Sequence, residues 1–152
     1  MFKELTGLKE RSNAFVRDLN VWISIAVADN ERLMVDLNRE QMRNSRLSTG
    51  QPISPPYSDA YAKKKGKREP DLFGKGIFQK EMFAQTNENN GTYFFGSFDF
   101  KAGFLSSPRT ATNRSGYGKD IFGLMPSNKV KVVPKASKSL LILWQKNVLQ
   151  KV

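Results

Sequence analysis

The residues with the clearest chemical potential form one short basic run. Five positive charges fall within six residues: Lys63, Lys64, Lys65, Lys67 and Arg68. Such a cluster gains affinity for polyanions, because each phosphate contact releases condensed counterions. The run therefore predicts contact with nucleic acid or with an acidic protein partner, although a solvated loop can have the same composition. Tyr57 and Tyr61 lie nearby in the sequence and offer rings that suit either base stacking or a core.

A second basic segment combines glycine with lysine. Gly116 and Gly118 precede Lys119, as in a phosphate-binding loop, but a Walker motif requires glycine where Asn113 stands and Ser or Thr where Asp120 stands. The surrounding segment, 106–119, is polar and without periodicity, which indicates a long exposed loop. We interpret it as a docking loop with four candidate contact residues: Arg109, Arg114, Tyr117 and Lys119.

Few residues are suited to enzyme chemistry. The chain has no histidine and no cysteine, which excludes Ser-His-Asp and Cys-His catalysis, disulfides and almost every zinc site. Carboxylates between residues 51 and 152 are scattered, without the close pairs that a metal-dependent nuclease uses. Ser137 and Lys138 are adjacent, but no predicted fold makes them a catalytic pair. We therefore expect a protein that is not an enzyme, with no catalytic residue, cofactor or metal.

Size and composition set the scale of the fold. The chain has 152 residues, of which 39% are hydrophobic, with 11 Phe, 4 Tyr and 2 Trp. This length predicts a single domain over 1–152. The aromatic residues provide bulk for a core, but the apolar content is below the average for globular chains. Part of the stability is therefore expected from neighbouring subunits, which favours an oligomer over a monomer.

Positive charge is concentrated in the last two-thirds of the chain, and the net charge is +11. Residues 1–50 carry 8 Lys and Arg against 7 Asp and Glu, whereas 51–152 carry 17 against 7. Residues 121–152 hold six lysines and no acid, a density that suits solvent or an acidic partner surface. No stretch approaches the about 18 consecutive apolar residues of a membrane span, and no secretory signal begins the chain. We expect no membrane contact and assembly in the cytoplasm.

The N-terminal third is predicted to be helical. From Leu8 to about Arg46 there is no proline or glycine, and apolar residues recur with helical spacing. Asp29 and Asn30 are a plausible interruption, so one long helix and two shorter ones both remain open. The apolar surface is broader than one packing seam requires. Four residues are therefore candidates for contacts between subunits as well as for the core: Trp22, Ile23, Val27 and Met34.

The middle of the chain predicts loops, short helices and a strand. Residues 47–57 contain three prolines and one glycine, which predicts an extended loop or arm. A helical turn is expected at Ser58–Lys65, followed by a short helix within Asp71–Ala84. Alternation over Thr92–Phe104 predicts a strand, with a hairpin partner near Phe104-Leu105.

The C-terminal part predicts a closing helix. It is expected to start at Pro126 and to be interrupted at Pro134, because proline removes a backbone donor. The predicted fold is α+β, with a long N-terminal helix, a small antiparallel sheet, a C-terminal helix and long exposed loops.

Local motifs in this order resemble a known family. They are Tyr57 with Tyr61-Ala62-Lys63, then Pro70-Asp71-Leu72 with Gly76 and Phe78, and finally Gly116-Tyr117-Gly118 leading into Ile121-Phe122-Gly123-Leu124. With a closing helix after them, they resemble the virion-morphogenesis group of tailed bacteriophages, whose members are neck or tail-completion proteins. The chain departs from the pattern at Lys75, where the family commonly has threonine, and at Pro134 in the closing helix.

The resemblance implies a structural role in the virion. Members of this family form homo-oligomeric rings around the DNA channel at the head–tail junction, between a portal or adaptor ring and the tail. Under this hypothesis the extended segments 47–57 and 106–119 serve docking, and the lysines face acidic neighbours or DNA. The alternative is a free, basic nucleic-acid-binding protein that uses Lys63–Arg68 and the C-terminal lysines as its main surface.

Overall fold

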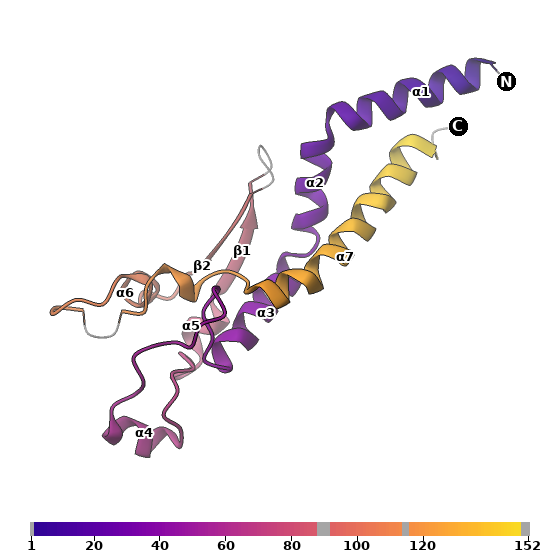
Figure 1. Ribbon diagram of the computed structural model, residues 1–152. Helices are drawn as coiled ribbons and strands as arrows, with labels where there is room; N and C mark the ends of the chain where they lie inside the picture. Colours follow the sequence, from indigo (N-terminus) through magenta and orange to yellow (C-terminus); the bar gives the residue numbers. More distant parts are fainter. Residues whose placement is uncertain (1, 88–91, 114–115, 150–152) are drawn as a thin grey trace.

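The fold is α+β, as predicted, and is dominated by helices. Figure 1 shows the computed structural model, which describes residues 2–87, 92–113 and 116–149. Three helices come first, α1 (Phe2–Arg17), α2 (Leu19–Ala28) and α3 (Glu31–Arg43). Of the two alternatives left open, the interruption at Asp29 and Asn30 is the one present, and a second interruption occurs at Asp18. At the first of these, the Asn30 side chain donates to the Ala26 carbonyl over 2.9 Å, a local bond that competes with helix continuation.

The middle of the chain contains one element that was predicted and one that was not. Helix α4 (Asp59–Lys65) follows Ser58 as expected and ends at Gly66, whose φ of 77° suits glycine. The prediction of one helix within Asp71–Ala84 is wrong in its second half. Helix α5 (Ile77–Lys80) is a single turn, and strand β1 (Met82–Thr86) follows it directly.

The sheet is a two-stranded antiparallel hairpin. Strand β2 (Tyr93–Ser97) pairs with β1, with Phe83 opposite Gly96 and Ala84 opposite Phe95. The predicted strand is therefore too long, and its expected partner at Phe104-Leu105 is wrong. Those two residues lie in a short helix, α6 (Ala102–Ser106). A turn precedes this helix, in which the Asp99 side chain accepts a hydrogen bond from the Lys101 backbone over 2.8 Å.

The closing helix runs along the helical arm of the molecule. A 3₁₀ turn, η1 (Lys119–Ile121), precedes α7 (Pro126–Trp144), which continues into the π-helical turn η2 (Gln145–Leu149). The predicted interruption at Pro134 is wrong. Pro134 lies on the exposed side of the helix, where water can satisfy the carbonyl that loses its N–H partner.

The molecule is elongated, with two helical layers forming its longer arm. Figure 1 shows α7 running antiparallel to α3, α2 and α1 in turn, so that the two ends of the chain lie close together. Arg11 fixes the far end, because its Nε donates to the Val148 carbonyl over 2.9 Å. Phe15 and Trp22 stack there with ring centroids 5.1 Å apart. None of the helices within 2–87, 92–113 and 116–149 combines the length and apolarity needed to cross a bilayer.

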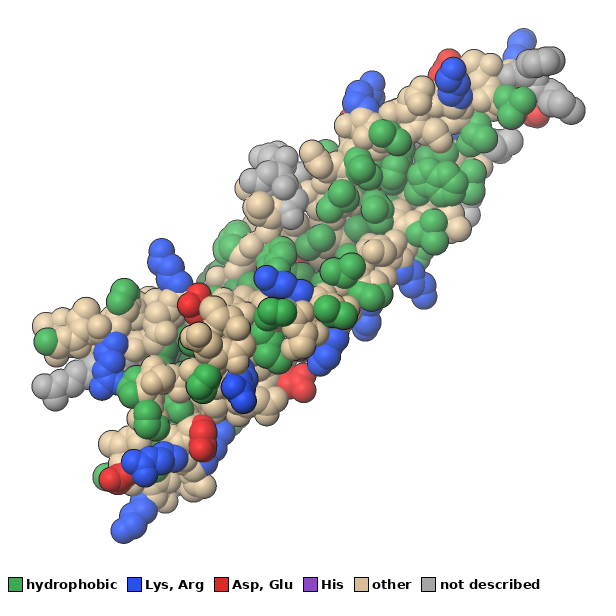
Figure 2. All heavy atoms as spheres, in the orientation of Figure 1, with side chains coloured by type: hydrophobic (Ala, Val, Ile, Leu, Met, Phe, Trp, Pro, Cys, Tyr) green, Lys and Arg blue, Asp and Glu red, His purple; other side chains and the backbone are tan. Residues whose placement is uncertain are grey.

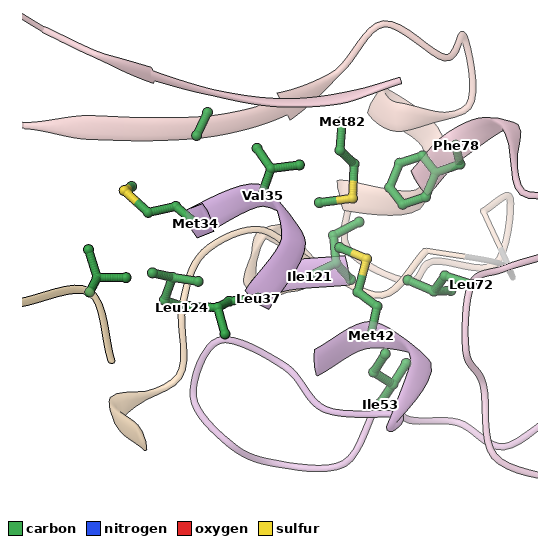
Figure 3. Packing of buried hydrophobic residues seen from close by; sticks show 12 residues of the cluster. Met34, Val35, Leu37, Met42, Ile53, Leu72, Phe78, Met82, Ile121 and Leu124 are labelled. Atoms are coloured by element: carbon green, nitrogen blue, oxygen red, sulfur yellow. The ribbon is translucent and has the colours of Figure 1, made fainter. Parts of the chain in front are cut away.

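The core lies at the junction of α3, β1 and the loops, as Figure 3 shows. Helix α3 contributes Met34, Val35, Leu37 and Met42, and Met34 and Met42 are completely buried. The remaining members come from distant segments and include Ile53, Leu72, Phe78, Met82, Ile121 and Leu124. One apolar cluster therefore holds the N-terminal helix, the hairpin and both long loops together.

Buried amides join α3 to the segment before α7. Asn38 donates to the carbonyls of Ile121 and Gly123, over 3.2 and 2.9 Å. Gln41 donates to Gly123 over 3.1 Å and accepts from the Met125 backbone over 2.8 Å. Asn128 donates to the Leu37 carbonyl over 3.2 Å. These bonds satisfy buried backbone groups and fix where α7 begins.

We predict that Gln41→Ala lowers the free energy of unfolding by about 2 kcal/mol, because it removes a buried side chain and leaves the partly buried Met125 N–H and Gly123 carbonyl without this partner. Urea denaturation measures the change. Glu40→Ala is the matched control, since Glu40 is the exposed neighbour on the same helix. Equal urea midpoints for the two variants would contradict the assigned role of Gln41.

Candidate functional site

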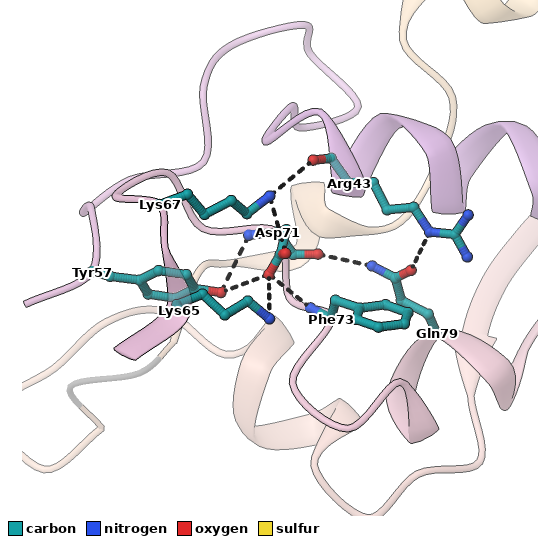
Figure 4. A network of polar contacts seen from close by, with 7 residues as sticks. All are labelled: Arg43, Tyr57, Lys65, Lys67, Asp71, Phe73 and Gln79. Atoms are coloured by element: carbon teal, nitrogen blue, oxygen red, sulfur yellow. Dashed lines mark hydrogen bonds and ion pairs between the residues drawn. The ribbon is translucent and has the colours of Figure 1, made fainter. Parts of the chain in front are cut away.

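The predicted basic run is partly an internal ion-pair network, shown in Figure 4. Asp71 is 6% exposed and forms ion pairs with two lysines. Lys65 Nζ lies 3.4 Å from its Oδ1 and Lys67 Nζ lies 3.0 Å from its Oδ2. Arg68 pairs with Asp59 over 2.9 Å at the surface. Among the described residues, Lys63 and Lys64 make no ion pair, and both are exposed. The run therefore offers outside partners two free cations of the predicted five.

Asp71 is also a centre of hydrogen bonds. Its Oδ1 accepts from the Tyr57 hydroxyl over 3.0 Å and from the Phe73 backbone over 3.1 Å. Its carbonyl accepts from Gln79 over 2.8 Å, and Gln79 in turn accepts from Arg43 Nε over 3.1 Å. The network links α3, the 47–57 loop, α4 and the turn before α5.

Ionisation of this centre follows from its contacts. Burial acts to raise the pKa of Asp71, but the Phe73 N–H, Lys67 and Tyr57 stabilise the carboxylate more strongly, so its pKa lies below the ordinary value. Burial and the neighbouring Asp71 carboxylate raise the pKa of Tyr57 far above its ordinary value. Asp71 is therefore charged and Tyr57 neutral at pH 7.

The turn after Asp71 has an unusual backbone. Leu72 has a φ of 51°, which is rare for a residue with a branched side chain, and its side chain is buried in the core. The Asp71–Phe73 hydrogen bond closes the turn around it. The conformation points Leu72 inward and leaves the Phe73 ring half-exposed at the surface.

A cavity of about 600 Å³ opens beside this network. The two predicted extended segments border it, with Pro55, Pro56 and Tyr57 from one and Arg109 and Tyr117 from the other. Helix α4, the turn before α5 and helix α6 complete its walls. Burial raises the pKa of Tyr117, which remains neutral.

The four predicted docking residues separate in the structure. Arg109 and Tyr117 line the cavity. Lys119 is exposed at the start of η1, outside the cavity lining. Arg114 lies outside the described residues. Tyr57, Gly76, Phe78 and Tyr117, which belong to the motifs quoted above, meet around one cavity although they are far apart in the sequence.

The four predicted oligomer-packing residues also lie in different environments. Met34 is fully buried within the chain and leaves no surface for a second subunit. Val27 packs against the same core, and Trp22 is half-buried against Phe15. Ile23 is 37% exposed, which makes it the member of these four that is exposed and open to contact with a second subunit.

Exposed apolar side chains cover the helical arm. Helix α2 contains no charged residue, yet Leu19 and Val21 are 37% and 46% exposed. A helix that is apolar all round is normally buried on every side. Figure 2 shows hydrophobic side chains gathered along the arm. The subunit alone therefore leaves α2 partly uncovered.

Helix α7 has three distinct sides. Asn128 and Val132 are buried against the rest of the chain. Val130, Val133 and Leu141 are 70%, 61% and 53% exposed, and their spacing places them on one outward face. Lys131, Lys135 and Lys138, at spacings of 4 and 3, form a separate exposed row. Sequence reasoning missed the outward apolar face, although the spacing of Val130, Val133 and Leu141 is a signal for it.

The hairpin carries an outward aromatic face. Phe98 stacks on Phe83 with centroids 4.6 Å apart, and Phe94 meets Phe83 edge-on at 5.9 Å. The Phe83 ring covers Gly96, where an added Cβ would lie 2.6 Å from it. The predicted alternation placed Phe94 and Phe98 on one face, and that face is turned away from α3. Alternation identifies the two faces of a strand but not which one is buried.

Comparisons with known proteins give no relative. No protein-family model, no curated protein and no solved structure matches the chain. Within the described part of the chain, no group of three or more acidic residues is placed to hold a metal ion.

We predict that Asp71→Asn lowers the free energy of unfolding at pH 7 by about 2–3 kcal/mol, because it leaves two lysines without their buried counterion. Since folding lowers the pKa of Asp71, its contribution is present above about pH 4 and is lost as the pH falls through the folded value. Urea denaturation at pH 7 and pH 2.5 should therefore show the variant and wild type converging in acid.

Asp59→Asn is the control for this experiment. It makes the same chemical change in an exposed ion pair, so little loss of stability is expected at either pH. A difference between Asp71→Asn and wild type that stays constant from pH 7 to 2.5 would refute the proposed ionisation.

Proposed function

We propose that the chain is a structural subunit of a tailed-bacteriophage virion, forming a homo-oligomeric ring at the head–tail junction around the DNA channel. The observation that carries the proposal is the uncovered apolar surface of α2 and α7 on a well-packed subunit. The assignment to a phage virion is supported by the resemblance of the sequence motifs quoted above to the virion-morphogenesis group. Assembly would take place in the host cytoplasm, with a portal or adaptor and a tail protein as partners.

The exposed apolar side chains support association between copies. Leu19 and Val21 on α2 and Val130 and Leu141 on α7 have open surface on the same arm. Removing such surface from water stabilises an assembly by roughly 25 cal/mol per Å² of apolar area. A head-to-tail ring joins two different faces of each subunit, and the arm and the hairpin offer two such faces.

The lysine row of α7 supports a position beside a polyanion. Lys131, Lys135 and Lys138 lie on one side of the helix, next to the outward apolar face rather than within it. In a ring closed through the apolar face, that row would remain free to face the DNA channel. Long-range attraction of this kind needs no base-specific contact.

A free nucleic-acid-binding protein has less support. Its predicted surface combined Lys63–Arg68 with the C-terminal lysines. The lysines of α7 are exposed, but in Lys63–Arg68 two of the five cations are paired with the buried Asp71 and a third with Asp59 at the surface. A solitary binder also gives no reason for an uncharged, half-exposed α2.

We predict that Val130→Ser/Leu141→Ser weakens self-association by about tenfold or more, because the two side chains lose apolar area that the assembly would bury. Mass photometry over a concentration series measures the dissociation, and negative-stain microscopy shows whether the wild-type oligomer is a ring.

Lys131→Ser/Lys138→Ser is the matched control, since it places the same new residues on the other exposed side of α7. That variant should self-associate at least as well as wild type, because it removes like charges. Wild-type protein that stays monomeric at high concentration, alone and with a portal ring, would defeat the proposed function.

A further inference from the structure

We propose that the cavity between α4, the turn before α5 and the 106–119 loop binds an acidic, apolar peptide segment of a partner protein. The identity of that partner as a head–tail junction protein rests on the proposed function. The chemistry of the segment rests on the cavity alone.

The charge of the cavity lining is one-sided. Lys75, Lys101 and Arg109 line it, and no Asp or Glu does. None of the three makes an ion pair with another described residue. They come from three separate segments of the chain. Positive charge left uncompensated in this way favours an anionic occupant, whereas the charge of Lys65 and Lys67 is compensated internally by Asp71.

Most of the remaining lining is apolar. Tyr61, Phe73 and Ile77 are 41%, 41% and 54% exposed, and Pro55 and Pro56 lie beside them. A volume of about 600 Å³ is within the range of specific binding sites. Aromatic and aliphatic walls with a few cations match a segment that carries both carboxylates and large apolar side chains.

The aromatic rings are placed poorly for stacking on bases. Tyr57 and Tyr61 meet edge-on with centroids 4.7 Å apart, and the Tyr57 hydroxyl is bonded to Asp71. Arg43 and Lys65 each lie 5.6 Å from the centre of the Phe73 ring. Single-strand binders instead present open rings along a continuous basic groove. These contacts favour a peptide over nucleic acid.

The walls are also fixed before any partner arrives. Asp71 holds Tyr57, Lys65 and the Phe73 backbone through the bonds described above. Gly76 lies against Phe73, where an added Cβ would approach the ring to 3.2 Å. A preformed site loses less entropy on binding than one that must be ordered.

The test is selection from a random twelve-residue peptide library on the wild-type protein. We expect the selected peptides to be enriched in Asp or Glu together with Phe, Trp or Leu. The most enriched peptide is then labelled with fluorescein, and its affinity is measured by anisotropy. Lys101→Gln/Arg109→Gln should weaken binding at least tenfold, because two charge-assisted contacts are lost.

Lys135→Gln/Lys138→Gln on α7 is the matched control, since it removes the same net charge away from the cavity. It should leave peptide affinity within about twofold of wild type. Thermal unfolding checks that both variants remain folded. Tyr61→Ser is a second cavity variant, which should weaken binding without any change of charge.

Three results would overturn the proposal: selection without acidic enrichment, equal loss of affinity in both charge variants, or no enrichment at all. Tighter, cavity-dependent binding of oligothymidine would assign the site to nucleic acid instead. Self-association is measured on the same samples, where the cavity variants should assemble as wild type does. Peptide binding by a protein that never assembles would contradict only the proposed ring function. Assembly without peptide binding would contradict only the proposed peptide site.

Discussion

The packing of α3 is the constraint on which the rest of the structure depends. One side of this helix supplies the largest share of the apolar core, including the fully buried Met34 and Met42. Beside them, Asn38 and Gln41 bind the backbone of the segment that leads into α7. Apolar burial supplies most of the free energy, and the amides select one register, because any slip would leave buried backbone groups unpaired. The direction of α7, and so the shape of the whole arm, follows from that register.

Asp71 fixes the arrangement of the segments at the loop end of the molecule, as the packing of α3 fixes the arrangement at its centre. A buried carboxylate is stable only if it is paired and hydrogen-bonded, and here one side chain contacts two lysines, a tyrosine and a backbone N–H. The 47–57 loop, α4 and the turn at Leu72 are thereby held in one arrangement. Since Lys65 and Lys67 are paired with Asp71, the unpaired cations described in this region are Lys63 and Lys64 on α4 and the three that line the cavity.

The sequence predicted the elements whose signals are local. The helical N-terminal third, α4 between Ser58 and Gly66 and the start of α7 at Pro126 follow from apolar periodicity and from the positions of glycine and proline. The break at Asp29-Asn30 was one of two open alternatives. Strand β1 was missed because Met82 and Phe83 continue the weak apolar pattern of the helix before them, and only pairing with the neighbouring strand β2 makes this segment a strand. Helix α7 continues through Pro134 because this residue is exposed to solvent, and its exposure depends on the tertiary structure rather than on the local sequence. Composition located the basic run but could not show that Asp71 would compensate two of its lysines.

Helix α7 also sets a physical condition for assembly. Its outward apolar face favours association, while its lysine row carries like charges that would be brought together if copies packed side by side. The two effects respond differently to solution conditions. Hydrophobic burial changes little with moderate salt, whereas repulsion between exposed lysines is screened within about 8 Å at physiological ionic strength.

A polyanion passing beside the lysine row would neutralise its charge more completely than salt. If the chain assembles as proposed, its acid-free closing helix therefore couples the stability of the ring to the presence of DNA.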